Sequence, residues 1–242
     1  MGHRRTRLGA AVIGAGAMTT LAAATATATT TATTTATTTA TTVAHWQMDE
    51  PPGAATMADS SGHGHDGAIS GVTLGLAGRS DGAGAYHFDG GSMVRVPHHA
   101  ELNPGTAPIT ISAWVRVPAD LRKGDYNVIQ KGTATASGGA YKLEVFAKVG
   151  RKFGFPACAF NGPTKAKNRV YGPVTIADGQ WHHVECHLTA TQAYAVVDGR
   201  SGPVAKRVVP SIANSTDLTI GGKPTDVHHF IGDLDEVSVS IG

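Results

Sequence analysis

Oxygen-bearing side chains gather in one glycine-rich string, ADSSGHGHDG, which contains Asp59, Ser61 and Asp66. Calcium takes about six to eight oxygen ligands, and a glycine-rich turn can direct its backbone carbonyls toward an ion. The string therefore predicts a hard-cation pocket. The alternative is that Asp59 and Asp66 only cap turns, through hydrogen bonds to the neighbouring backbone.

The chain contains 12 histidines, which are candidate metal ligands. Consecutive side chains of an extended strand point in opposite directions, so an adjacent histidine pair cannot chelate one metal from a single face. The H-x-H formed by His63 and His65 can, because its two imidazoles share a side. Zinc needs another ligand or two, and nothing nearby in the sequence has a diagnostic spacing. We interpret these histidines as solvated side chains.

Paired carboxylates would indicate glycoside hydrolysis, which places an acid and a nucleophile about 5 Å apart in retaining enzymes. Glu144 stands alone in YKLEVFAK, and the only acidic cluster in a strand-like run is Asp233, Asp235 and Glu236. That run continues as apolar VSVSI, and no GxSxG nucleophile motif occurs. The sequence predicts a protein that is not an enzyme, with a glycoside hydrolase or polysaccharide lyase as the alternative.

The elements that must position these residues are β-strands. Short runs rich in Val, Ile, Thr and aromatics recur between Gly, Pro, Asn and Asp, which is typical of an all-β sandwich. In ITISAWVRV, Ile109 to Val117 alternate between two faces, and Trp114 lies on the face away from the core. Asp198-Gly199 predicts a type I′ turn leading to a strand near Val204. The expected strands are Ala44–Met48, Ala68–Leu74, Ala85–Phe88, Met93–Val96, Ile109–Val117, Asn127–Gln130, Tyr141–Ala147, Lys152–Phe160, Gly172–Ile176, Trp181–Thr189, Ala193–Val197, Val204–Val209, Asp217–Ile220 and Phe230–Ile241.

The N-terminal segment has the layout of a secretory signal. A basic head precedes an apolar stretch and an Ala-x-Ala-like exit, which predicts a signal peptide over 1–28. An Ala/Thr-rich linker over 29–42 follows, because that composition cannot form a core. Too many threonines interrupt the stretch for the alternative, a membrane anchor of about 20 apolar residues. One domain over 43–242 remains, and we expect it outside the cell without a membrane span.

Charge and cysteine content agree with export. Three of the 20 Lys and Arg residues lie in the head, so 17 basic residues would face 18 acidic ones after cleavage. A basic surface for nucleic acid is therefore not expected.

Cys158 and Cys186 are the only cysteines, and an oxidising compartment favours a disulfide between them over two buried thiols.

The ordered succession of HWQMDE, ADSSGHGHDG, AYHFDGGSMVRVP, ITISAWVRV, DGQWHHVECHL, VVDGR, LTIGG and IGDLDEVSVSI resembles the laminin-G-like domains of the concanavalin A-like lectin/glucanase superfamily, in an exported, actinomycete-like bacterial form. The resemblance spans nearly all of 43–242. It implies a two-sheet antiparallel jelly roll, usually a non-catalytic module that binds glycans or proteins, often with a structural calcium ion. One departure is His63, which stands where such domains often carry Asn, and imidazole is a poor calcium ligand.

In such a jelly roll the two chain ends are commonly neighbours, which would bring Asp233 or Asp235 beside the glycine-rich string. The predicted calcium ligands are therefore Asp59 with Asp235, supported by Ser61, Asp66 and Asp233.

We expect a monomeric extracellular recognition module. Glycan binding, protein binding, and a structural or adhesive role without a small-molecule ligand all stay open. Aromatic residues make up only 6% of the chain, and we expect Trp46, Trp114 and Trp181 to pack rather than to form a sugar platform. No ligand-binding residue is identified by the sequence.

Overall fold

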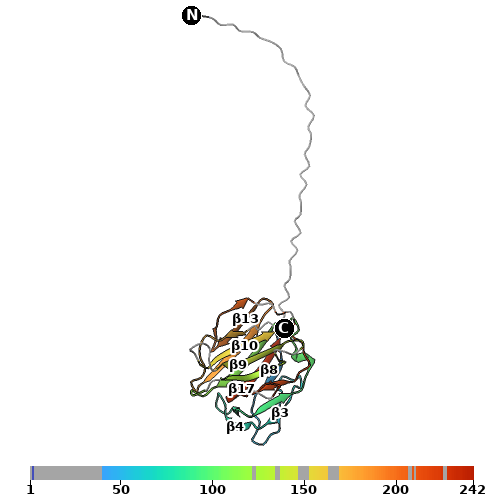
Figure 1. Cartoon of the computed structure of the whole chain (residues 1–242), viewed down its shortest axis with the longest axis vertical. Coiled ribbons are helices and arrows are strands. Elements are labelled where there is room, and N and C mark those ends of the chain that lie inside the picture. The colour runs from blue at the N-terminus through green and yellow to red at the C-terminus, as the bar shows by residue number, and fades with distance from the viewer. Residues whose placement is uncertain are drawn as a thin grey trace. The chain divides into compact units, whose positions relative to one another are not determined.

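The protein is an all-β sandwich in a computed structural model of the chain (Figure 1). The structure describes residues 2, 40–121, 124–133, 137–146, 153–162, 169–206, 209, 211–225 and 228–242. The predicted signal peptide and most of the predicted linker lie outside these residues. Thr38–Gly242 forms one compact unit. Within the described part of the chain, no helix is both long and apolar enough to span a bilayer.

Two antiparallel sheets form the sandwich. Sheet A has the strand order β14-β13-β12-β7-β17-β5-β4, with β1 paired to β17 and β15 paired to β13. Sheet B has the order β11-β10-β9-β8-β16-β6-β3-β2. In Figure 1, β13 lies at the end of the body opposite β3 and β4. The bounds are β1 Thr41–Trp46, β2 Thr56–Met57, β3 Gly67–Ser70, β4 Thr73–Ala77, β5 Gly84–Asp89, β6 Met93–Val96, the 3₁₀ helix η1 Ala100–Leu102, β7 Ile109–Arg116, β8 Asp125–Lys131, β9 Ala140–Phe146, β10 Phe155–Asn161, β11 Arg169–Tyr171, β12 Trp181–Leu188, β13 Gln192–Val197, β14 Arg200–Ser201, β15 Ala205–Lys206, β16 Leu218–Ile220 and β17 Ile231–Ile241.

The core lies between the two sheets and follows the period-two pattern of the sequence. In β7 the residues from Ile109 to Val115 alternate buried and half-buried, and Trp114 is on the outer face, as predicted. Cys158 of β10 and Cys186 of β12 are fully buried and form a disulfide, with Cα atoms 5.5 Å apart. The disulfide links sheet B to sheet A, so it shows which face of each strand points inward.

Three predicted strands differ from the structure. The single strand expected over Ala68–Leu74 is two strands in different sheets, because Gly71 adopts a φ of +70° and turns the chain between β3 and β4. No strand occupies Gly172–Ile176; its neighbour β11 ends at Tyr171, one residue before that segment begins. The strand expected over Val204–Val209 is described only as β15, with 207–208 outside the described residues.

The Asp198-Gly199 turn and the start of β1 can be compared with the sequence predictions. Asp198 and Gly199 have φ angles of +48° and +75°, as the type I′ turn requires, and the returning strand is β14 at Arg200 rather than a strand near Val204. β1 begins at Thr41, within the segment that the sequence assigns to the linker. Thr41 pairs with Ile241 of β17, so the first and last strands of the described sandwich are neighbours.

Candidate functional site

The glycine-rich string forms a turn organised by Asp59. Its Oδ1 accepts hydrogen bonds from the backbone N–H groups of His45 and Ser61, both at 2.9 Å. Its Oδ2 accepts from Ser61 Oγ at 2.8 Å and from the His65 N–H at 2.9 Å. Asp66 Oδ1 in turn accepts from the Asp59 N–H. Burial opposes the charge of Asp59, but these hydrogen bonds outweigh it and lower the pKa of the carboxyl.

A carboxylate offers about four lone-pair sites, and the Asp59 carboxylate receives four donors. This is the turn-capping arrangement that the sequence left open beside a calcium role for Asp59, Ser61 and Asp66. None of the interactions among the described residues joins Asp59 to Asp235. The calcium prediction for these three residues stays a prediction, but their oxygens already serve the turn.

Asp233 and Asp235 lie two residues apart on β17 and have different surroundings. Asp233 Oδ1 pairs with His87 Nδ1 at 2.7 Å, and Asp233 Oδ2 accepts from Arg116 Nε at 2.7 Å. Asp235 is fully buried, and its Oδ2 accepts the Arg79 N–H at 3.0 Å. Asp235 Oδ1 has no hydrogen-bond partner among the described residues. Burial therefore raises the pKa of Asp235.

Oxygen atoms converge around Asp235. A Cβ placed on Gly78 would lie 2.2 Å from the Gly84 carbonyl oxygen and 2.9 Å from Asp235 Oδ2. A Cβ placed on Gly84 would lie 2.9 Å from the Met48 carbonyl oxygen and 3.1 Å from Asp49 Oδ1. Two glycines thus keep open a cradle made of the carboxylates of Asp235 and Asp49 and of backbone carbonyls. This is the all-oxygen donor set that calcium prefers, so the residues present fit that ion.

The outer face of sheet B follows from the direction of Cys158, which points toward sheet A. Its neighbours on β10, Ala157 and Ala159, therefore point away from the core. Cross-strand partners share a face, and these two alanines pair with Glu144 and Lys142 of β9. Cross-strand pairing extends this outward face from β9 and β10 to β8, β11 and β16. Six polar side chains on this outer face form what we call the polar floor: Asn127, Gln130, Lys142, Glu144, Arg169 and Thr219.

The polar floor faces outward and yet is largely buried. Asn127, Glu144 and Thr219 are fully buried, and Gln130 is 3% exposed. The Glu144 carboxylate forms ion pairs with Lys142 Nζ and, at 2.7 Å, with Arg169 Nη2. Burial lowers the pKa of Lys142, and the attraction to Glu144 partly offsets this.

Several polar atoms of the floor have no partner. Both side-chain atoms of the Asn127 amide and Oε1 of Gln130 make no hydrogen bond among the described residues. A buried polar group without a partner costs about 1–3 kcal/mol, so native structures rarely retain one without a use. The floor therefore has buried donors and acceptors that lack partners among the described residues.

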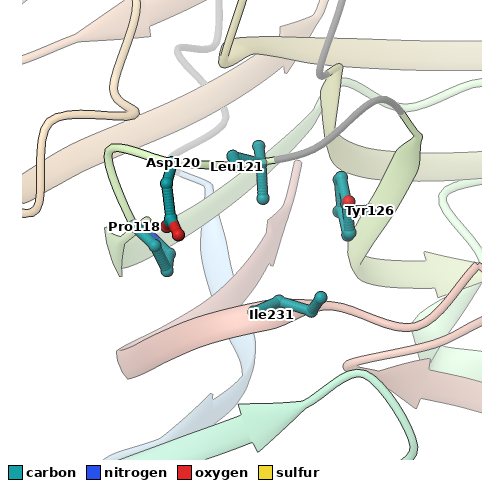
Figure 2. Close-up of a pocket in the computed structure, with 5 residues that line it drawn as sticks. All are labelled: Pro118, Asp120, Leu121, Tyr126 and Ile231. Carbon is teal, nitrogen blue, oxygen red and sulfur yellow. The ribbon is translucent and has the colours of Figure 1, made fainter.

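Aromatic rings lie at one end of the polar floor. The Phe146 and Tyr171 rings are perpendicular at 6.1 Å, and the Arg169 guanidinium lies 4.1 Å above the Phe146 ring. A separate hollow lies beside β8 and is lined by Pro118, Asp120, Leu121, Tyr126 and Ile231 (Figure 2). Its volume is about 210 Å³. Ligand pockets usually have about 300–1,000 Å³, so the polar floor is the stronger candidate.

The sequence analysis missed the polar floor, although one signal was present. In YKLEVF, Lys142 and Glu144 alternate with apolar residues, which indicates a strand with one polar face. It also missed Asp49, which lies in the HWQMDE string. The tryptophans pack as expected: Trp46 is fully buried, and Arg side chains cover the rings of Trp114 and Trp181.

Comparison with known proteins identifies the family. Residues 88–240, more than half of the chain, match the model of the "Concanavalin A-like lectin/glucanases superfamily". The chain belongs to this superfamily. The family resemblance seen in the sequence is thereby confirmed, and so is the jelly roll of two antiparallel sheets, whereas the exported, actinomycete-like form stays a prediction. No curated protein matches the chain by sequence.

Solved structures share the fold at low identity. The binding domain of Paraclostridial Mosquitocidal Protein 1 has a TM-score of 0.63 and 16% identity over 82% of this chain, which spans about half (48%) of that one. Domain 4 of AbnA, a GH43 extracellular arabinanase from Geobacillus stearothermophilus, has a TM-score of 0.59 and 16% identity, covering 84% of this chain and 93% of that one. Mouse laminin alpha1 domains LG4-5 have a TM-score of 0.50 and 16% identity, and the match covers 71% of this chain and 46% of the laminin chain. Such likeness shows a shared fold.

Proposed function

We propose that the protein is a secreted, monomeric recognition module whose polar floor binds a glycan without transforming it. The observation that carries this proposal is a set of buried, outward-facing amide atoms without partners among the described residues, namely both polar atoms of the Asn127 amide and Oε1 of Gln130. Sugar hydroxyls both donate and accept hydrogen bonds, so one saccharide could satisfy an amide N–H and an amide carbonyl together. The disulfide and the predicted signal peptide support a place outside the cell.

The charge of the floor restricts the glycan. Lys142 and Arg169 supply two positive charges against the single carboxylate of Glu144. We therefore expect neutral or anionic glycans rather than cationic ones. The aromatic rings of Phe146 and Tyr171 offer apolar surface for a sugar face beside the polar groups. The structure of AbnA domain 4 was determined in complex with arabinotriose, which supports saccharide binding on this fold.

Binding without turnover agrees with the surroundings of Glu144. Glycoside hydrolysis uses two carboxylates on either side of the scissile bond. Among the side chains that the structure describes on the floor, Glu144 is the one carboxylate, and two cations hold it. A turnover assay on any glycan that binds tests this part of the proposal, since release of shortened products would identify a hydrolase or lyase.

We further propose that a structural calcium ion lies at Asp235 rather than at Asp59. The ligands would be the carboxylates of Asp235 and Asp49 with nearby backbone carbonyls such as that of Met48. The unpartnered Oδ1 of Asp235 supports this placement, because a cation would compensate its buried charge. The ion would tie the segment after β1 to β17 and stabilise the sandwich.

A glycan array on the full chain identifies ligands, and one substitution then tests the floor. Asn127→Val removes two unpartnered buried polar atoms and keeps a residue that suits a strand. We expect glycan binding to be lost while the free energy of unfolding stays equal or rises by about 1 kcal/mol. Gln192→Ala, on an exposed amide of β13, is the matched control and should keep full binding.

The paired readout separates a binding role from a structural one. If Asn127→Val binds the same glycans with the same affinity, the polar floor is not the binding site. If the variant instead loses stability together with binding, Asn127 supports the fold and the argument from its missing partners is wrong.

A further inference from the structure

A second constellation lies away from the polar floor, where the Asp59 turn meets η1. His63 Nδ1 is 3.1 Å from Glu101 Oε2, and His65 Nε2 is 3.4 Å from the same oxygen. One ligand atom from each of His63, His65 and Glu101 lies within 4.8 Å of the others. The H-x-H pair thus gains the third ligand that its neighbourhood in the sequence did not supply.

The spacing suits a tetrahedral metal. Zinc binds nitrogen and oxygen at about 2.0–2.1 Å, so two ligands of a tetrahedron lie about 3.3–3.4 Å apart. The two separations to Glu101 Oε2, 3.1 and 3.4 Å, are close to that value, and all three ligand atoms lie within 4.8 Å of one another. Two histidines and one glutamate also form a known set of zinc ligands, with water in the fourth position.

His65 indicates that this cluster is prepared for a ligand. Its side chain is completely buried, its Nδ1 has no hydrogen-bond partner among the described residues, and its Nε2 has only the 3.4 Å contact with Glu101 Oε2. Its backbone is fixed at both polar groups: the N–H donates to Asp59 Oδ2, and the carbonyl accepts from Trp46 Nε1 at 2.8 Å. The turn therefore holds a buried imidazole in place, with Nε2 directed at Glu101.

We propose that His63 Nδ1, His65 Nε2 and Glu101 Oε2 bind one divalent transition-metal ion of the zinc class, with water as a further ligand. The ion would replace the His63–Glu101 hydrogen bond and link the turn after β2 to η1. It differs from the calcium cradle at Asp235 in its ligand atoms, because imidazole nitrogen selects zinc-class ions over calcium.

Calorimetric titration of the tag-free full chain with Zn²⁺ tests this site, and Co²⁺ absorption reports its geometry. We expect one Zn²⁺ per chain, a rise in melting temperature and a tetrahedral Co²⁺ spectrum. His63→Gln and Glu101→Gln should each lower the Zn²⁺ affinity at least tenfold. Both residues are on the surface, so these variants should fold, whereas a change at buried His65 would confuse binding with stability.

Two controls complete the experiment. His187→Gln removes a histidine that also faces a carboxylate, Glu185 at 3.3 Å, and should bind Zn²⁺ as the wild type does. Asp235→Asn should also keep Zn²⁺ binding, which separates this site from the calcium cradle. The proposal is overturned if the wild type binds no Zn²⁺ at about millimolar concentration. It is equally overturned if His63→Gln and Glu101→Gln titrate like the wild type.

Discussion

Replacing Cys158 and Cys186 together with alanine should lower the free energy of unfolding by about 3.6 kcal/mol. The two residues are 28 positions apart. In the chain-entropy model, closing a loop of that length removes about 12 cal/mol/K from the unfolded state, which gives this value at 25 °C. For a domain of about 200 residues, the loss corresponds to a melting temperature lower by roughly 7–14 °C.

Urea unfolding of the oxidised wild type, the reduced wild type and the double-alanine variant measures this loss. Reduction breaks the link but keeps both sulfur atoms, so the reduced wild type is the matched control for packing. The two unlinked forms should agree within about 1 kcal/mol. A loss below about 1 kcal/mol in both would refute the loop-entropy reasoning. Two reactive thiols on the native wild type would refute the disulfide itself.

Two further predictions concern charge. Hydrogen bonds to Asp198 and Asp178 outweigh the burial of His182 and raise its pKa above 6.5. The stabilising contribution of His182 is therefore complete below the unfolded-state pKa and is lost as the pH rises through the folded-state pKa. Urea titrations should accordingly show His182→Gln least stable relative to the wild type near pH 5.5, with a gap that closes by about pH 9; a gap independent of pH would contradict this. Calcium at a hundredfold excess over its dissociation constant should stabilise the wild type by about 2.7 kcal/mol and leave Asp235→Asn unchanged, with Asp120→Asn as the control that still responds. An equal calcium response in all three proteins would contradict the cradle.

Much of the fold could be predicted because the alternation of apolar and polar residues within a strand shows which side chains are buried. The alternation in β7 and the Asp198-Gly199 turn follow from residues within a few positions of each other. The errors arose where a local pattern was ambiguous. Gly71 could sit inside a strand or end one, and only the different sheets of β3 and β4 decide between these cases.

The candidate sites were harder to predict because they depend on contacts distant in the sequence. Asp59 was recognised as important, but a carboxylate in a glycine-rich turn serves equally as a calcium ligand or as a cap until its donors are known. His63 and His65 were recognised as a pair, while Glu101 reaches them only through the packing of η1. The polar floor combines residues of four strands, and no single string contains it.

The central claim is that the outer face of sheet B holds a glycan through the unpartnered amide atoms of Asn127 and Gln130 Oε1. Isothermal titration of an array-selected glycan against the wild type, Gln130→Ala and Gln192→Ala tests it most directly. The account predicts at least a tenfold loss of affinity for Gln130→Ala and none for Gln192→Ala, because only the first amide faces the floor. Equal affinities for all three proteins would contradict the claim.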